Sequence, residues 1–284
     1  MQTILKSKNN TVNIDTEGPI TIIGERINPT RRKKLIDALS ERQYDFVLEL
    51  AESQIQAGAD ILDINVGVPG IDEPAVMSEV VSAVSEAFDV PLCLDSPNPQ
   101  TLAAGLATAP GRPMVNSVNG EERALEAILP VVKEFGVPVI GLVIDDEGIS
   151  MEPEKRLSIA AKIIERAGIL GIPIEDIVID PLAMAVSADH NGGLVTQRTI
   201  ALISDEFGVN MTLGASNVSF GLPERQIVNQ AFLALVALNG ASCAITNPLK
   251  LTSSIRAIDL LLGRDEYSMR YIKQYRSMQK LKAA

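Results

Sequence analysis

Short runs of aliphatic residues alternate with longer amphipathic segments along most of the chain. Each run has the length of a buried strand, and each longer segment repeats its apolar residues at helical spacing. The predicted strands lie at residues 20–24, 61–66, 91–95, 113–116, 137–144, 176–180, 211–215 and 242–246. The predicted helices lie at 33–57, 73–88, 99–108, 121–135, 153–169, 194–207, 223–239 and 251–263, with a last basic helix at 266–281.

This alternation predicts a parallel sheet, because strands separated by helices pair in parallel through right-handed crossovers. Eight strand–helix units in about 245 residues match the (β/α)8 TIM barrel, which typically has about 250 residues. A doubly wound open sheet is the alternative arrangement of the same elements. Since no long linker interrupts the pattern, we predict one α/β domain over residues 1–284, with the barrel at about 20–263 and an extra C-terminal helix.

Polar residues follow the predicted strands at the ends where active sites of this barrel lie. They are Glu25 and Asn28, Asp63 and Asn65, Asp95, Asn116 and Asn119, Asp145 and Asp146, Asp180, Ser216 and Asn217, and Asn247. Helix caps favour the same residue types, which accounts well for Asp145 and Asp146 but only partly for the others. Asp63 and Asn65 are two positions apart, so both face one side of their strand.

The composition narrows the chemistry of these strand ends. The chain has one histidine, His190, and two cysteines, Cys93 and Cys243. A His- or Cys-rich zinc site therefore cannot be built within one chain, and a Ser-His-Asp triad would depend wholly on His190. Cys93 shares a strand face with Asp95, which indicates an inert thiol below a polar rim. Cys243 lies on an apolar strand, and we expect it in the core.

The charge balance and hydropathy narrow the partners. With 25 basic and 36 acidic residues the net charge is −11, which argues against a nucleic-acid binder. No apolar run reaches the roughly 18 residues of a membrane span, and no targeting signal is visible. Because low cysteine usage suits a reducing compartment, we expect a cytoplasmic protein that binds neither nucleic acid nor membrane.

Carboxylates and amides without basic partners suit a flat heterocycle that offers several N–H donors beside a carbonyl. A carboxylate accepts two parallel N–H bonds, and an amide can both donate and accept. Pterins have such an edge. An oxygen-ligand site for Mg²⁺ or Mn²⁺, made by Asp63, Asp95 and Asp180, is the competing interpretation, and the residue pattern alone leaves both open.

Several strand-end motifs resemble one enzyme family over residues 20–262. Ile23-Gly24-Glu25-Arg26-Ile27-Asn28 is similar to the opening motif of the methyltetrahydrofolate:corrinoid/iron-sulfur protein methyltransferases. The further matches are Asp63-Ile64-Asn65-Val66-Gly67, Leu92-Cys93-Leu94-Asp95-Ser96, Val115-Asn116-Ser117, Ile179-Asp180-Pro181-Leu182 and Ser216-Asn217-Val218-Ser219. The same pterin-binding barrel occurs in the folate domain of cobalamin-dependent methionine synthase and, more distantly, in dihydropteroate synthase. The characteristic Lys and Arg motifs of the last family are not evident here.

The resemblance implies how the pterin ring is bound. Asp95, Asn116 and Asp180 match the residues that hold the polar edge of the ring. Asp63 and Asn65 match the contribution of the second strand to the floor of the site. The resemblance therefore implies a dihydropteroate-synthase-like barrel whose substrate is methyltetrahydrofolate or tetrahydrofolate.

The resemblance also implies a reaction, the transfer of the N5-methyl group between methyltetrahydrofolate and a Co(I) corrinoid. Asn217 matches an asparagine that hydrogen-bonds near N5, which makes it the candidate catalytic residue. Arg225 falls where the family often has an arginine after the seventh strand. Alternatives are a dihydropteroate synthase-like enzyme and a non-catalytic pterin-binding protein.

The corrinoid is expected on a separate partner protein, and no metal is expected on this chain. The cobalamin-binding motif Asp-x-His-x-x-Gly is not present at 188–193, where Asp189 and His190 are adjacent, so we predict that His190 is an exposed loop residue. A homodimer is implied by the resemblance. Residues 31–34 could meet a folate glutamate tail or simply be solvated. Residues 264–284 carry a net charge of +4, which leaves a net charge of −15 on the rest of the chain. This segment is either a solvated helix or a docking surface.

Overall fold

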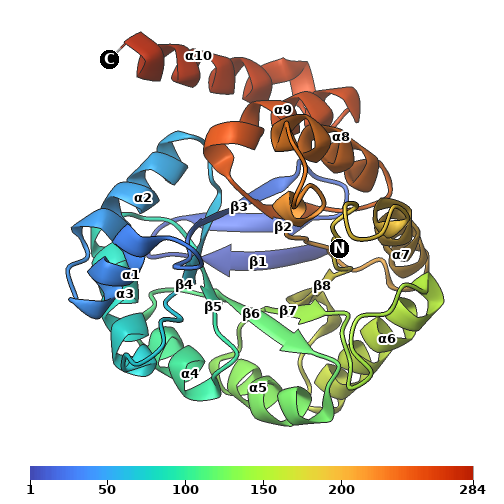
Figure 1. Ribbon diagram of the computed structural model, residues 1–284, viewed down its shortest axis with the longest axis horizontal. Helices are drawn as coiled ribbons and strands as arrows, with labels where there is room; N and C mark the ends of the chain where they lie inside the picture. Colours follow the sequence, from blue (N-terminus) through green and yellow to red (C-terminus); the bar gives the residue numbers. More distant parts are fainter. Residues whose placement is uncertain (284) are drawn as a thin grey trace.

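The computed structural model describes the backbone of residues 1–283 and the side chains of residues 1–279. Its centre is a curved sheet of parallel strands in the order β8-β7-β6-β5-β4-β3-β9, ringed by helices (Figure 1). The strands are β3 (Thr21–Ile27), β4 (Ile61–Asn65), β5 (Leu92–Asp95), β6 (Met114–Asn119), β7 (Val139–Leu142), β8 (Ile177–Asp180) and β9 (Cys243–Thr246).

Residues 211–214 close the sheet into a barrel between β8 and β9. Thr212 N donates to Ile179 O at 2.9 Å, and Ile245 N donates to Leu213 O at 3.0 Å. Parallel bridges join Ile179 to Met211 and Gly214 to Ile245. The predicted strand at 211–215 is thus reduced to isolated bridges, but the predicted TIM barrel is confirmed.

The helices lie outside the barrel, where their apolar faces cover the strands. They are α1 (Lys33–Ser40), α2 (Asp45–Gln56), α3 (Glu73–Ala87), α4 (Pro99–Thr108), α5 (Glu122–Phe135), α6 (Pro153–Ile169), α7 (Gly192–Phe207), α8 (Arg225–Leu238), α9 (Pro248–Leu261) and α10 (Met269–Ala283). The one long helix predicted at 33–57 is wrong. Arg42 has a φ of 54, and this left-handed turn ends α1 and separates it from α2.

An N-terminal hairpin, which the sequence pattern did not predict, covers the N-terminal end of the barrel. Strands β1 (Gln2–Lys6) and β2 (Thr11–Asp15) pair antiparallel and cross below the barrel interior in Figure 1. Leu5 and Ile14 are fully buried in one cluster with inward residues of the barrel strands. Asn210 fixes the hairpin, because its Nδ2 donates to Thr3 Oγ1 and to Ile14 O, both at 3.0 Å. The floor of the barrel is therefore apolar.

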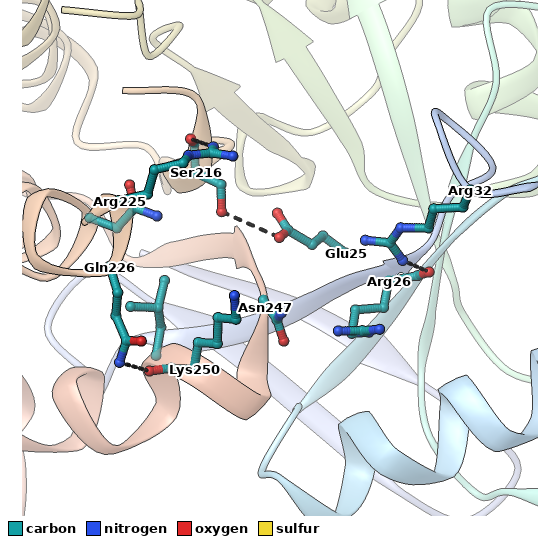
Figure 2. A pocket seen from close by; sticks show the side chains of 10 residues that line it. Glu25, Arg26, Arg32, Ser216, Arg225, Gln226, Asn247 and Lys250 are labelled. Carbon is teal, nitrogen blue, oxygen red and sulfur yellow. Dashed lines mark hydrogen bonds between the residues drawn. The ribbon is translucent and has the colours of Figure 1, made fainter. Parts of the chain in front are cut away.

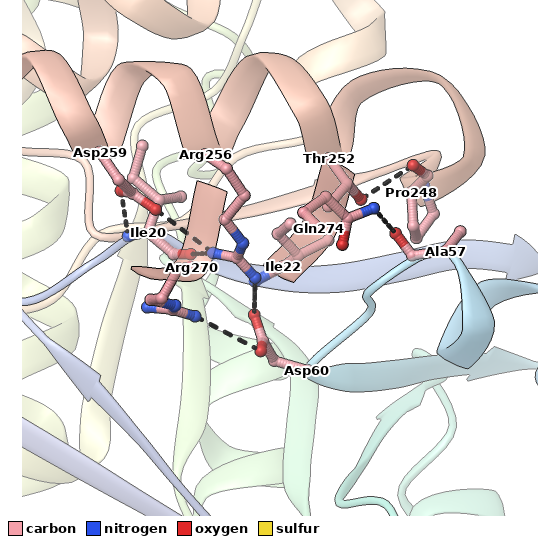
Figure 3. A network of polar contacts seen from close by, with 10 residues as sticks. All are labelled: Ile20, Ile22, Ala57, Asp60, Pro248, Thr252, Arg256, Asp259, Arg270 and Gln274. Atoms are coloured by element: carbon pink, nitrogen blue, oxygen red, sulfur yellow. Dashed lines mark hydrogen bonds and ion pairs between the residues drawn. The ribbon is translucent and has the colours of Figure 1, made fainter. Parts of the chain in front are cut away.

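The predicted C-terminal helix is present as α10, and a polar network attaches it to the barrel (Figure 3). Arg256 Nη1 donates to Ile20 O at 3.0 Å, and Arg256 Nη2 lies 3.2 Å from Asp60 Oδ2. Arg270, on α10, lies 3.8 Å from the same carboxylate. The buried Asp259 accepts from Ile20 N at 2.7 Å. This network joins α9, α10 and the starts of β3 and β4. Within the described chain, no helix has the length and apolarity needed to cross a bilayer.

We predict that the hairpin is part of the core. Leu5→Ala should lower the free energy of unfolding by about 2–4 kcal/mol, because it leaves a cavity between the hairpin and the barrel strands. Ile4→Ala is the matched control, since Ile4 lies on the outer face of the same strand and is 38% exposed. Urea unfolding measures both changes. Equal losses in the two variants would contradict the core role of the hairpin.

Candidate functional site

The inward side chains of β4, β5 and β6 change from apolar to polar toward the carboxyl ends of the strands. Strand residues alternate between the two faces of the sheet. In the strand register Asp63 is paired with Cys93. Two residues closer to the carboxyl ends of the strands, Asn65, Asp95 and Asn116 lie side by side. Three neighbouring strands therefore present a continuous polar row at the mouth of the barrel, above the apolar floor.

Each carboxylate in this row accepts a hydrogen bond from an amide side chain on another strand, either the adjacent strand or the one beyond it. Asn65 Nδ2 donates to Asp95 Oδ2 at 2.9 Å, and Asn116 Nδ2 donates to Asp63 Oδ1 at 3.1 Å. Asn65 is itself fixed, because its Oδ1 accepts from Gly67 N at 2.8 Å. The four predicted side chains Asp63, Asn65, Asp95 and Asn116 thus form one cluster of fixed orientation.

Burial raises the pKa of both carboxyl groups in the cluster. Asp63 is only 3% exposed. Its pKa is well above the ordinary value because of burial and, next, because of the neighbouring Asp95 charge. Burial also raises the pKa of Asp95. Among the described side chains, neither carboxylate makes a salt bridge. A ligand with N–H donors would stabilise their charged forms.

Asp180 ends β8, further around the barrel. Its Oδ1 accepts from Leu182 N at 2.8 Å. Leu182 has a φ of 67, so the loop turns sharply just after the carboxylate. Burial raises the pKa of Asp180 to about 7, and the Leu182 hydrogen bond and the nearby Arg156 charge only partly offset that effect. Asp180 is therefore a carboxyl group that can change its charge near neutral pH.

Arg156 fixes the Asp180 loop from behind, and no sequence pattern identified it. The residue is fully buried on α6. Its Nη1 donates to Pro181 O at 2.8 Å and to Leu182 O at 2.9 Å, and its Nε donates to Ser150 O at 2.8 Å. A buried cation thus holds the two carbonyl groups that follow Asp180 and favours the ionised form of that carboxyl group.

A second polar region lies on the other side of the mouth, at the ends of β3, residues 214–217 and β9. It is a recess of about 290 Å³. Figure 2 shows Glu25 between Ser216 and the arginines of the β3 end. Ser216 Oγ lies 3.3 Å from Glu25 Oε1, and burial raises the pKa of Glu25. The side chains that matter here are Glu25, Arg26, Arg32, Ser216, Arg225 and Lys250.

The remaining two predicted site residues lie at this second region rather than at the carboxylate cluster. Asn217 is exposed at the end of a short 3₁₀ turn, Ala215–Asn217. Its Nδ2 would lie 2.8 Å from a Cβ at residue 214, so Gly214 leaves room for it. Arg225 Nε donates to Ser219 Oγ at 3.0 Å and its Nη2 donates to Ser216 O at 2.6 Å. The guanidinium thereby braces the loop that carries Asn217.

The histidine and cysteine predictions are confirmed. The His190 side chain is 91% exposed in the loop before α7. Cys93 and Cys243 are free and buried, and burial raises the pKa of Cys243 to about 12. In residues 1–279, no group of three or more His, Cys, Asp or Glu side chains is placed to hold a metal ion.

Comparison with known proteins agrees with this arrangement. The sequence pattern of the family described as pterin binding enzyme matches residues 24–247. The chain is 32% identical over 265 residues to the methylcorrinoid:tetrahydrofolate methyltransferase of Eubacterium limosum, covering 90% of this chain and 96% of that protein. It is also 32% identical to the methionine synthase of Mycobacterium tuberculosis, covering 87% of this chain but only 23% of that longer protein.

Solved structures share the fold at lower identity. The dihydropteroate synthase of Yersinia pestis matches with a TM-score of 0.69 and 17% identity, over 93% of this chain and all of the other. The dihydropteroate synthase of Xanthomonas albilineans, in complex with 7,8-dihydropteroate, matches with a TM-score of 0.68 and 20% identity, over 91% and 98%. These likenesses establish the barrel type that the sequence motifs predicted.

We predict that Asp180 lowers the stability of the protein at alkaline pH. Its pKa of about 7 in the folded chain lies above the value of about 3.9 in an unfolded chain. The folded state therefore binds the proton more tightly, and stability is lost as pH rises through 7. Asp180→Asn, which keeps an oxygen acceptor for Leu182 N, should be roughly 1–3 kcal/mol more stable than wild type at pH 8. The difference should shrink at pH 5.

Chemical unfolding at the two pH values measures this difference. Asp146→Asn, a change at an exposed carboxylate of another strand end, is the matched control. An Asp180→Asn advantage that is the same at pH 5 and pH 8 would show that ionisation of Asp180 does not set it.

Proposed function

The chain belongs to the pterin-binding enzyme family, and on that basis we propose that it transfers a methyl group between N5 of tetrahydrofolate and a corrinoid carried by a separate protein. The match to a methylcorrinoid:tetrahydrofolate methyltransferase over 96% of that relative carries this assignment. The Asp and Asn row at the barrel mouth supports it independently, because that row suits the N–H and carbonyl edge of a pterin.

We infer that the polar edge of the pterin binds to Asp95, Asn116 and Asp180. The two carboxylates accept from ring and amino N–H groups, and the Asn116 amide can serve a ring atom of either type. Asp63 and Asn65 act indirectly: Asp63 accepts a hydrogen bond from Asn116 and fixes its orientation, and Asn65 donates one to Asp95 and fixes its orientation. Removing one such partner would leave buried N–H donors unpaired, which costs about 1–3 kcal/mol.

Asn217 is the proposed catalytic residue. In transfer from methyltetrahydrofolate the bond between N5 and the methyl carbon breaks, Co(I) supplies the electron pair of the new bond, and N5 takes up a proton. A tertiary amine leaves poorly unless N5 is protonated or hydrogen-bonded by the transition state. A hydrogen bond from Asn217 that strengthens as N5 changes charge would lower the barrier, with water at the open mouth exchanging the proton. The reverse transfer uses the same contacts.

The corrinoid partner would approach the mouth of the barrel, where Asn217 is exposed. The N-terminal hairpin closes the opposite end with its buried inner residues Leu5 and Ile14, so the mouth is the side on which a methyl group at N5 can meet cobalt. We propose that this chain supplies the pterin site and positions N5, that the partner supplies the corrinoid, and that both work in the cytoplasm. Arg225 supports this geometry through its hydrogen bonds to the loop of Asn217.

The proposed homodimer has a suitable surface on α8. Ile227, Leu235 and Leu238 are 63%, 46% and 70% exposed, and the exposed Ala231 and Ala234 lie between them. These positions recur at helical spacing, so they form one apolar stripe. A stripe of this kind packs well on the same stripe of a second copy related by a two-fold axis.

We predict that Asn217→Ala slows methyl transfer more than it weakens binding. Single-turnover transfer from methyltetrahydrofolate to reduced cobalamin, followed by loss of the Co(I) absorbance, should fall about 100-fold. Affinity for tetrahydrofolate should stay within about tenfold. Asn13→Ala is the matched control, because Asn13 is exposed at the closed end. An unchanged rate in Asn217→Ala would refute the catalytic role. A wild-type protein that transfers no methyl group to free cobalamin or to a corrinoid protein would refute the function itself.

We predict that Leu235→Asp converts a dimer to a monomer, because the carboxylate would be buried without a partner in the interface. Sedimentation velocity measures the change. Ile169→Asp, at a residue on α6 that is 72% exposed, serves as the control and should sediment as wild type does. A wild-type monomer at micromolar concentration would rule out the proposed dimer.

A further inference from the structure

The two polar regions of the barrel mouth lie on different sides of it. The proposed pterin-edge residues lie on β5, β6 and β8. The recess is lined by residues at the ends of β3 and β9, by Ser216 and by the first turns of α8 and α9. In the ring order of strands, β3 and β9 are neighbours. A ring held by its polar edge against β5 and β6 therefore directs its opposite end, the C6 side that carries the folate tail, toward the recess.

The recess is rich in positive charge. Arg26, Arg32, Arg225 and Lys250 line it, with Glu25 as the carboxylate among them. Figure 2 shows their side chains around one opening. Burial and the neighbouring Arg26 charge lower the pKa of Arg32. The Arg32 guanidinium donates to Arg26 O, which keeps the two cations together. This part of the mouth thus attracts anions, although the chain as a whole carries −11.

Two buried polar atoms at the recess have no hydrogen-bond partner within the described residues. Asn229 is 7% exposed and lines the recess, and its Oδ1 is unpaired. Arg26 Nε is also buried and unpaired. Unsatisfied buried polar atoms are rare in folded proteins. An unpaired acceptor and an unpaired donor, set among cations, fit a ligand that has both an amide N–H and a carboxylate.

We propose that this recess binds the glutamyl tail of the folate, and that the preferred substrate is a folate with several γ-linked glutamates. This inference rests on the proposed function, which it deepens. Each glutamyl unit provides an amide N–H suited to Asn229 Oδ1 and an α-carboxylate suited to Arg26, Arg32 or Lys250. Beyond the recess, the exposed Arg31 and Lys33 extend the positive surface at the start of α1. Additional glutamates therefore find additional cations.

Binding measurements with three probes test the proposal. The probes are 5-methyltetrahydrofolate with one glutamate, the same molecule with three glutamates, and 6-methyltetrahydropterin, which has no tail. The triglutamate should bind wild type at least about fivefold more tightly than the monoglutamate at low salt. Lys250→Gln and Arg32→Gln should each reduce that preference and leave affinity for the tail-free pterin unchanged. Lys8→Gln, the same substitution at the closed end of the barrel, should keep the full preference.

Two results would overturn the proposal. One is equal affinity of wild type for the monoglutamate and the triglutamate. The other is a preference that survives in both Lys250→Gln and Arg32→Gln, since the tail would then bind elsewhere. Binding is measured without cobalamin, so failure here is distinguishable from failure of the proposed function. A tail preference without any methyl transfer would sustain this inference alone, and methyl transfer without a tail preference would sustain only the function.

Discussion

The interaction on which the rest of this structure depends is the burial of carboxyl groups at the barrel mouth. Asp63 and Asp95 are desolvated and make no salt bridge among the described residues, so their charged forms are unfavourable until a donor arrives. Amides rather than cations orient them. A lysine or arginine in place of Asn65 or Asn116 would form a salt bridge with the carboxylates before any ligand binds. Their selectivity for a ligand with N–H donors would then be lost. The cluster is tolerable because the barrel beneath it is well packed, from the inward side chains down to the hairpin residues Leu5 and Ile14.

The cations are instead placed where they do not neutralise that cluster. Arg156 lies behind the Asp180 loop, where it bonds to backbone carbonyls and only moderates the pKa of Asp180. Arg26, Arg32 and Lys250 line the recess on the β3 and β9 side. The mouth therefore has one side that accepts N–H donors and another that attracts anions. A molecule with a pterin at one end and carboxylates at the other would fit in one orientation, and that orientation would set the position of N5 beside Asn217.

Much of this could be predicted from the sequence, because parallel strands have a simple signature. Aliphatic runs separated by helices predicted the barrel, and Asp or Asn after each run predicted the row of Asp63, Asn65, Asp95 and Asn116. The hairpin was missed because its strands are short and mostly polar, with only Leu5 and Ile14 buried on the inner face. Arg156 was missed because, in the sequence, an arginine on an amphipathic helix is expected on the exposed face, whereas the structure buries it. Residues 31–34, Arg225 and Glu25 were named from the sequence, but their assembly with Arg26 and Lys250 into one recess was missed, because these residues come from separate segments that only the closed barrel brings together.

Proton release on pterin binding tests most directly the claim that buried carboxyl groups ionise to meet the ligand. Asp180, with a pKa of about 7 in the free protein, is largely protonated at pH 6.5. Donors from a pterin would favour its charged form and lower the pKa, so binding should expel a proton. Titration calorimetry of 6-methylpterin, an oxidised pterin without a basic N5 amine, in buffers of different ionisation enthalpy counts that proton. Proton release is expected at pH 6.5 and should be clearly smaller at pH 7.5, where Asp180 is already mostly ionised and the pterin lactam is still mostly neutral. Binding without proton release, or with proton uptake, at pH 6.5 would contradict it.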